Sequence, residues 1–139
     1  MRILLVDDEE DILESLGDVL TAALPKATTV AKATSIREAQ RQVAADEFDL
    51  VLTDERMPGG TGSELLTWLR AHHPDVHRGL MSAYIDVRAR FDDGRTDAEF
   101  FIHKPFEITE LVPLVERTVA SRGGAPSRRG PGPMPPSSA

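Results

Sequence analysis

Short apolar runs alternate with longer segments of helical spacing along most of the chain. Four runs have the length of a strand: 3–6, 48–53, 76–81 and 99–102. A fifth run, 28–33, is weaker and more polar, as expected of an edge strand. The candidate helices lie at about 10–24, 35–46, 62–73, 85–94 and 107–121. The pattern therefore predicts five alternating strand and helix units.

Local signals mark the starts and faces of several helices. Ser35 with Glu38, and Thr61 with Glu64, have the spacing of a capping box at the start of the second and third helices. The predicted apolar face of the first helix consists of Ile12, Leu16, Val19, Leu20 and Ala23.

Alternating strands and helices favour an α/β fold with a parallel sheet, because right-handed crossovers place helices on both of its faces. For five units the common arrangement is the flavodoxin-like, doubly wound sheet of order 2-1-3-4-5 with five helices. Ligands in such folds bind beyond the carboxyl ends of the strands, where the winding reverses between the first and third strands. The residues that follow the strands are therefore the candidates for function.

Polar residues follow four of the predicted strands. They are Asp7 and Asp8 after the first, Asp54 at the end of the third, Ser82 after the fourth and Lys104 after the fifth. Their separations match whole strand and helix units, so all should meet at one edge of the sheet. Three converging carboxylates repel unless a hard divalent cation joins them, and Mg²⁺ fits best because it takes few protein ligands and keeps waters.

A metal and a lysine beside a carboxylate suit phosphoryl chemistry, with Asp54 as the candidate nucleophile. Each residue also has an ordinary structural interpretation. Asp7, Asp8 and Ser82 suit helix caps, Asp54 suits a turn, and Lys104 suits a solvated surface. The functional hypothesis depends on their shared position rather than on any one of them.

Composition separates an acidic body from a basic tail. Residues 122–139 hold 12 Pro, Gly or Ser among 18 and three arginines without an acid, which predicts a disordered tail or linker after a domain of residues 1–121. The remaining 13 basic and 23 acidic residues leave a net charge of −10, which argues against direct nucleic-acid binding. The chain has no cysteine, no apolar run long enough for a membrane and no signal-peptide pattern at its start, so we expect a cytoplasmic protein.

Residues 1 to about 121 resemble the receiver domain of two-component response regulators. The motifs that carry the resemblance are Ile3-Leu4-Leu5-Val6-Asp7-Asp8-Glu9, Asp54-Glu55-Arg56-Met57-Pro58 with Gly62, Ser82-Ala83, and Phe101-Ile102-His103-Lys104-Pro105-Phe106. Four motifs in this order and at this spacing are highly specific.

The resemblance implies that Asp54 accepts a phosphoryl group from a histidine kinase or phosphotransfer protein. It implies Mg²⁺ bound by Asp8, Asp54 and the backbone carbonyl of Arg56, with Asp7 acting through water. Ser82 and Lys104 would each contact a phosphoryl oxygen, and the Lys104-Pro105 bond would be cis. No catalysis beyond slow self-phosphorylation and self-dephosphorylation is expected.

The same resemblance implies a switch and an output surface. Ser82 and the aromatic Phe101 would move on phosphorylation, and the fourth helix, fifth strand and fifth helix would then contact a downstream protein, an absent output domain or a second copy of the chain. Phe100 and Phe101, as adjacent strand residues, are equally explained as core residues on opposite faces.

Three features depart from a simple receiver pattern. Residues 85–94 are poorly amphipathic, which predicts a short, displaced or mobile fourth helix, and Pro113 should kink the fifth helix or delay its start. Arg56 and Tyr84 lie two residues after Asp54 and Ser82, where their bulk should hinder the attacking water and prolong phosphorylation.

Two other functions remain open at this point. A Mg²⁺-dependent phosphatase of the haloacid dehalogenase class would have a second aspartate two residues after the nucleophile, where this chain has Arg56. A docking module that is never phosphorylated is disfavoured by the intact Asp54, Ser82 and Lys104. The tail is either a linker to an absent output domain or a natural terminus.

Overall fold

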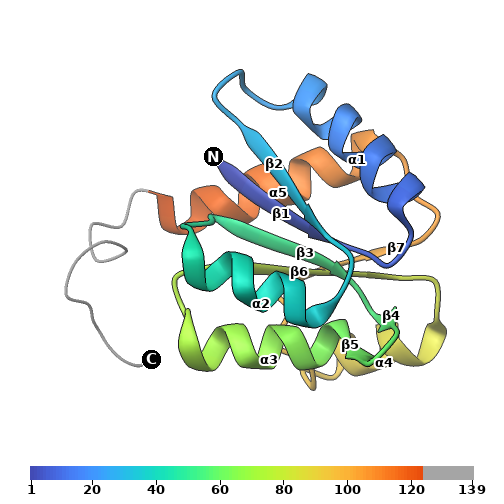
Figure 1. The fold of residues 1–139 in the computed structure, drawn as a ribbon. Helices are drawn as coiled ribbons and strands as arrows, with labels where there is room; N and C mark the ends of the chain where they lie inside the picture. Colours follow the sequence, from blue (N-terminus) through green and yellow to red (C-terminus); the bar gives the residue numbers. More distant parts are fainter. Residues whose placement is uncertain (124–139) are drawn as a thin grey trace.

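The computed structural model describes residues 1–123, and a five-stranded parallel sheet lies at its centre (Figure 1). The strands are β1 (Arg2–Val6), β2 (Thr29–Ala33), β3 (Leu50–Asp54), β6 (His77–Ser82) and β7 (Phe100–His103). Their order is β2-β1-β3-β6-β7, so the predicted flavodoxin-like order 2-1-3-4-5 is confirmed. Two short strands, β4 (Arg56–Met57) and β5 (Gly60–Thr61), form a separate antiparallel hairpin after β3.

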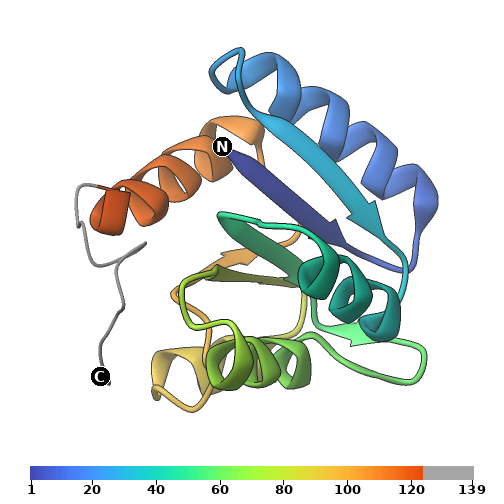
Figure 2. The same ribbon diagram turned by 60° about the vertical axis from the view of Figure 1, so that its left-hand side comes forward.

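Within the described residues, five helices cover the two faces of the sheet (Figures 1 and 2). They are α1 (Glu10–Ala23), α2 (Ile36–Ala45), α3 (Gly62–His72), α4 (Ile85–Asp92) and α5 (Ile108–Gly123). Helices α1 and α5 pack on one face, and α2, α3 and α4 pack on the other. Because both faces are covered, the sheet is buried as all-parallel sheets usually are.

The core consists of two apolar layers separated by the sheet. Along β1, Leu4 and Val6 point into the layer under α2 and α3, whereas Ile3 and Leu5 point into the layer under α1 and α5. All four are fully buried, and each such side chain contributes about 1.5–3 kcal/mol to folding. Because both faces of the strand are buried, its sequence is a continuous apolar run rather than an alternation of apolar and polar residues.

Both predicted helix starts are confirmed. The Ser35 hydroxyl accepts the backbone N–H of Glu38 at 3.1 Å. Thr61 and Glu64 form a complete capping box, with hydrogen bonds of 3.1 and 2.9 Å. This capping box starts α3 directly after the β4–β5 hairpin.

The predicted apolar face of α1 was partly wrong. Val19 is 42% exposed and Ala23 is also exposed, whereas Leu13, Gly17 and Leu20 are buried. The face that contains Leu13 and Leu20 turns toward the layer shared with α5, and this turns Val19 to solvent. Helical spacing in this segment allows either face, and packing selects one.

The last two helices depart from ordinary amphipathic helices in different ways. α4 has eight residues and buries only Val87, which confirms the prediction of a short fourth helix. α5 begins at Ile108 and continues through Pro113, so the proline does not delay its start, and the predicted alternative of a kink at Pro113 stays a prediction. The Glu110 carboxylate accepts the backbone N–H of Glu107 at 2.7 Å and supports the start of the helix upstream of the proline.

The described chain ends at residue 123, two residues beyond the predicted domain limit. The predicted disordered tail or linker falls mainly on residues 124–139, which lie outside the described residues. Within the described part, none of the helices is long and apolar enough to cross a membrane.

Candidate functional site

The register of the sheet brings the polar residues after the strands to one edge. Val6 pairs with Thr53, so Asp7 follows β1 beside the end of β3, where Asp54 lies. Asp54 in turn pairs with Met81, the residue before Ser82. Ser82 pairs with His103, so Lys104 follows β7 at the same level.

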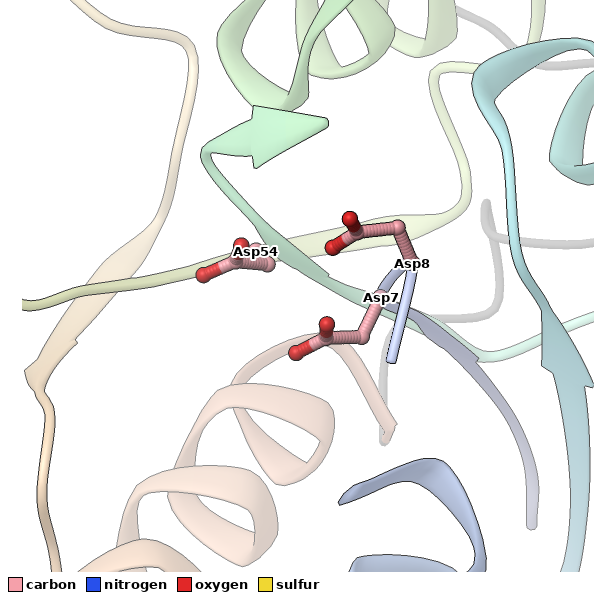
Figure 3. A group of neighbouring side chains, drawn as sticks. All are labelled: Asp7, Asp8 and Asp54. Carbon is pink, nitrogen blue, oxygen red and sulfur yellow. The ribbon is translucent and has the colours of Figure 1, made fainter. Parts of the chain in front are cut away.

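Three carboxylates gather at this edge (Figure 3). Asp7, Asp8 and Asp54 each offer an oxygen within 4.8 Å of the other two. Asp7 is fully buried, Asp54 is largely buried and Asp8 is exposed. The cluster is therefore rigid on its inner side and open to solvent at Asp8, and its all-oxygen ligands suit a hard divalent cation.

Lys104 supplies the positive charge at the cluster. Its Nζ lies 3.0 Å from Asp7 Oδ2 and 3.0 Å from Asp54 Oδ1, and the Lys104–Pro105 peptide bond is cis, as the resemblance implied. Burial alone would lower the pKa of Lys104, but the two carboxylates outweigh it and raise that pKa. The ammonium therefore stays charged between the two aspartates.

One ammonium does not neutralise three carboxylates. Burial and the charge of Asp7 raise the pKa of Asp54, against the opposing effect of Lys104. Asp7 is more constrained, because its Oδ1 accepts the backbone N–H of Glu9 at 3.0 Å and its Oδ2 accepts Lys104. The remaining excess of negative charge favours binding of a cation at the open side.

Ser82 and Phe101 lie on adjacent strands with different surroundings. Ser82 is 1% exposed, and its Oγ accepts the backbone N–H of Tyr84 at 3.1 Å. Phe101 is buried beside Phe91 of α4, with ring centres 5.7 Å apart, whereas Phe100 points into the opposite layer. Each therefore contacts α4 or the loop that leads into it.

Arg56 and Tyr84 form a bulky pair above the strand ends. The Arg56 guanidinium carbon lies 3.8 Å from the centre of the Tyr84 ring, which is a cation–π contact. Arg56 Nη2 also lies 3.8 Å from Asp86 Oδ2. The β4–β5 hairpin and the loop before α4 are thus linked directly next to the site.

Gly62 allows the hairpin to return close to the site. A Cβ at this position would collide with the backbone carbonyl of Asp54, and the Gly62 N–H donates to the Glu55 carbonyl at 2.8 Å. A glycine is therefore required where α3 begins against the end of β3.

Sequence reasoning missed Glu55 as a residue of interest. Its side chain is 5% exposed and contacts both α3 and α4. A glutamate directly after a buried strand was the only available signal, and its partner, Arg90, lies 35 residues away.

Comparison with known proteins agrees with this geometry. Residues 3–116 match the family described as the response regulator receiver domain. The chain is 32% identical over 121 residues to the response regulator protein PilR of Pseudomonas aeruginosa, with 87% of the chain and 26% of PilR covered. It is 34% identical over 115 residues to the DNA-binding transcriptional regulator NtrC of Escherichia coli, with 83% and 24% covered.

Solved structures give the same result. The response regulator TrrA from Thermotoga maritima, in complex with Mg²⁺-BeF, has a TM-score of 0.74 at 30% identity, with 84% of this chain and 97% of TrrA covered. The HemR receiver domain from Leptospira biflexa has a TM-score of 0.73 at 31% identity, with 86% and 94% covered. The chain belongs to the receiver domain family of two-component response regulators.

Membership of this family places the chain in two-component signalling, with a histidine kinase as the implied partner. Receiver domains are generally signal transducers rather than enzymes. The chain spans about a quarter of the length of PilR and NtrC.

Proposed function

We propose that Asp54 accepts a phosphoryl group from a histidine kinase or phosphotransfer protein in the presence of Mg²⁺. The observation that carries this proposal is the position of the Asp54 carboxylate. It lies 3.0 Å from Lys104 Nζ and shares with Asp7 and Asp8 a cluster of oxygens that fits a divalent cation.

In the proposed transfer, a carboxylate oxygen of Asp54 attacks the phosphorus atom of the donor phosphohistidine. An oxygen–phosphorus bond forms, the phosphorus–nitrogen bond breaks, and its electron pair returns to the donor imidazole. Asp8, Asp54 and the backbone carbonyl of Arg56 would hold Mg²⁺, with Asp7 acting through water. When bound, the cation supplies positive charge that offsets the phosphoryl oxygens.

Lys104 and Ser82 have complementary roles in the proposal. The Lys104 ammonium, already beside Asp54, pairs with one phosphoryl oxygen, and the Ser82 hydroxyl donates to another. Because Ser82 Oγ accepts the N–H of Tyr84, a shift of this hydroxyl would pull on the loop that leads into α4. Phe101, packed on Phe91, would respond with α4.

The proposed output is a change in the surface formed by α4, β7 and α5. It would control a downstream protein, an output domain outside this sequence or a second copy of the chain. NtrC is named as a DNA-binding transcriptional regulator, which supports transcriptional output for a longer protein of this type. The acidic body itself is not proposed to bind nucleic acid, and we propose a cytoplasmic location.

Arg56 and Tyr84 are proposed to prolong the phosphorylated form. Their stacked side chains link the two loops that border the phosphoacceptor. A water molecule must approach phosphorus in line with the bond to Asp54, and bulky groups on both loops reduce that access.

The experiment that tests the proposal is incubation with Mg²⁺ and acetyl phosphate, followed by measurement of the intact mass. We expect a single phosphoryl adduct that is lost in the Asp54→Asn variant and when Mg²⁺ is chelated. Asp11→Asn, which changes an exposed acid near the same edge, is the matched control and should keep the adduct. An adduct on Asp54→Asn would refute the assignment of the phosphoacceptor.

Two alternatives make different predictions in the same assay. An unphosphorylated docking module gains no adduct and shows no Mg²⁺-dependent change. A Mg²⁺-dependent phosphatase turns over a small phosphate ester repeatedly, but Arg56 stands where that class has its second aspartate.

A further inference from the structure

A chain of polar contacts connects the phosphoacceptor strand to the last turn of α4. It begins at Glu55, a buried residue that directly follows Asp54. Burying a carboxylate in this way is costly unless it is fully hydrogen-bonded or paired with a cation.

One oxygen of Glu55 is bound to the start of α3. Glu55 Oε1 accepts the backbone N–H and the hydroxyl of Ser63, each at 2.8 Å. Ser63 is the second residue of α3, where backbone N–H groups and the helix dipole favour a negative charge. These bonds hold the Glu55 side chain in one orientation.

The other oxygen is bound to α4. Glu55 Oε2 accepts Arg90 Nη2 at 2.9 Å, across 35 residues of sequence. Arg90 Nη1 lies 3.5 Å from Asp86 Oδ2, and Asp86 also faces Arg56. Arg90 therefore joins α4 both to the end of β3 and, through Asp86, to the β4–β5 hairpin.

Apolar packing holds α4 only weakly. Val87 is its single buried residue, and Phe91 is its partly buried contact with Phe101, whereas Ile85 is 81% exposed. The Glu55–Arg90 ion pair also borders a surface pocket of about 320 Å³ between the hairpin and α4. A helix with so little buried apolar surface depends strongly on one partly buried ion pair.

We propose that the Glu55–Arg90 ion pair is a clamp that holds α4 against the phosphoacceptor end of β3 and couples the position of α4 to phosphorylation of Asp54. The coupling to phosphorylation rests on the proposed function, whereas the role of the ion pair in holding α4 does not. Glu55 and Arg90 are positioning residues. Breaking the ion pair frees α4 to rearrange. The loss of the pair also lowers the barrier to the movement of α4 that accompanies phosphorylation of Asp54.

The first measurement is amide hydrogen exchange across residues 85–94 in the unmodified full chain. Glu55→Gln and Arg90→Met should each speed exchange in α4 at least tenfold, with little change in β1 and β3. The double variant should exchange no faster than the single variants, because both remove the same interaction. Arg90→Lys, which keeps one charged donor, should restore part of the protection.

Asp92→Asn is the matched control. It removes the exposed Arg88–Asp92 pair, which lies wholly within α4, and should leave exchange at the wild-type rate. Arg90→Met changes a side chain that is 35% exposed, so it should fold even if Glu55→Gln does not. If the amides of residues 85–94 exchange in Arg90→Met at the same rate as in wild type or in Asp92→Asn, the ion pair does not hold α4.

The second measurement is the initial rate of phosphorylation by acetyl phosphate. Arg90→Met and Glu55→Gln should react several-fold faster than wild type and Asp92→Asn. An unchanged or slower rate with faster exchange overturns the coupling. If wild type gains no phosphoryl group at all, the proposed function fails, and the exchange experiment still decides whether the ion pair holds α4.

Discussion

Both ends of the central sheet bury carboxylates, but in opposite electrostatic surroundings. At the carboxyl ends of the strands, Asp7 and Asp54 share the Lys104 ammonium beside the exposed Asp8, and the pKa of Asp54 is raised. At the other end, Glu99 faces His77 at 3.0 Å and accepts the backbone N–H of Arg78 at 2.9 Å.

The result at this second end is a carboxylate that favours its charged form. Burial alone would raise the pKa of Glu99, but His77 and Arg78 lower it to about 2. A carboxylate with sufficient partners stabilises the fold, whereas a cluster with too few cations remains available to bind one. The contrast separates a structural network from a candidate functional site within the same sheet.

The largest effect that would test this contrast is expected for Lys104→Met. Loss of the ammonium removes a preorganised charge beside Asp54, and the initial rate of phosphorylation by acetyl phosphate should fall by roughly 10²–10³-fold. His103→Gln, at the exposed neighbouring residue, serves as the control and should react like wild type. A rate for Lys104→Met within threefold of wild type would show that Lys104 has no role in the transfer.

The second prediction concerns the stability of the protein at low pH. Because the folded-state pKa of Glu99 lies below its ordinary value of 4.5, its contribution to stability is present above that value and is lost as the pH falls toward 2. Protonation of Glu99 should therefore lower the free energy of unfolding by roughly 3 kcal/mol. Urea unfolding at pH 7 and at pH 2.5 measures this effect. The free energy of unfolding should fall less between the two pH values in Glu99→Gln than in wild type.

Asp54 should contribute to this profile with the opposite sign. Its folded-state pKa is raised, so its contribution to stability is present below its unfolded value of 3.8 and is lost as the pH rises through the folded value. Asp54→Asn should therefore gain stability relative to wild type as the pH rises from acid to neutral. Parallel pH profiles for Glu99→Gln and Asp54→Asn would contradict the contrast between the two ends.

At neutral pH, Glu99→Gln should lose about 2 kcal/mol of unfolding free energy and keep the wild-type rate of phosphorylation. The amide retains an acceptor for the Arg78 N–H but loses the charge beside His77. Asp46→Asn breaks an exposed pair with Arg2 and should leave the free energy of unfolding nearly unchanged in the same urea assay. A slowed phosphorylation in Glu99→Gln would mean that the two ends are coupled.

The smallest effect is expected for Arg56 and Tyr84, whose side chains stack next to the site. Replacing Arg56 and Tyr84 together by alanine should speed loss of the phosphoryl group several-fold, about 1 kcal/mol in activation free energy. The decay of the adduct, followed by intact mass, measures it. The double change His72→Ala with His73→Ala, at the end of α3, should not alter the decay. An unchanged rate in the Arg56 and Tyr84 variant would exclude steric hindrance of the water.

Much of the fold could be predicted because its signals are local. Apolar runs of strand length, the capping residues Ser35 and Thr61, and the repeated spacing of strand and helix units depend on near neighbours in the chain. The same spacing indicated that Asp7, Asp54 and Lys104 would meet at one edge of the sheet. The strand order was predicted as the common doubly wound arrangement of five such units.

Only the tertiary structure decided which of several locally equivalent arrangements occurs. α1 buries Leu13 rather than Val19 because the adjoining elements select one of its faces. Glu55 contacts Arg90 across 35 residues, and His77 contacts Glu99 across 22. Such pairs depend on how whole elements pack, because side chains at those separations carry no periodic signal by which the sequence could show them to be partners.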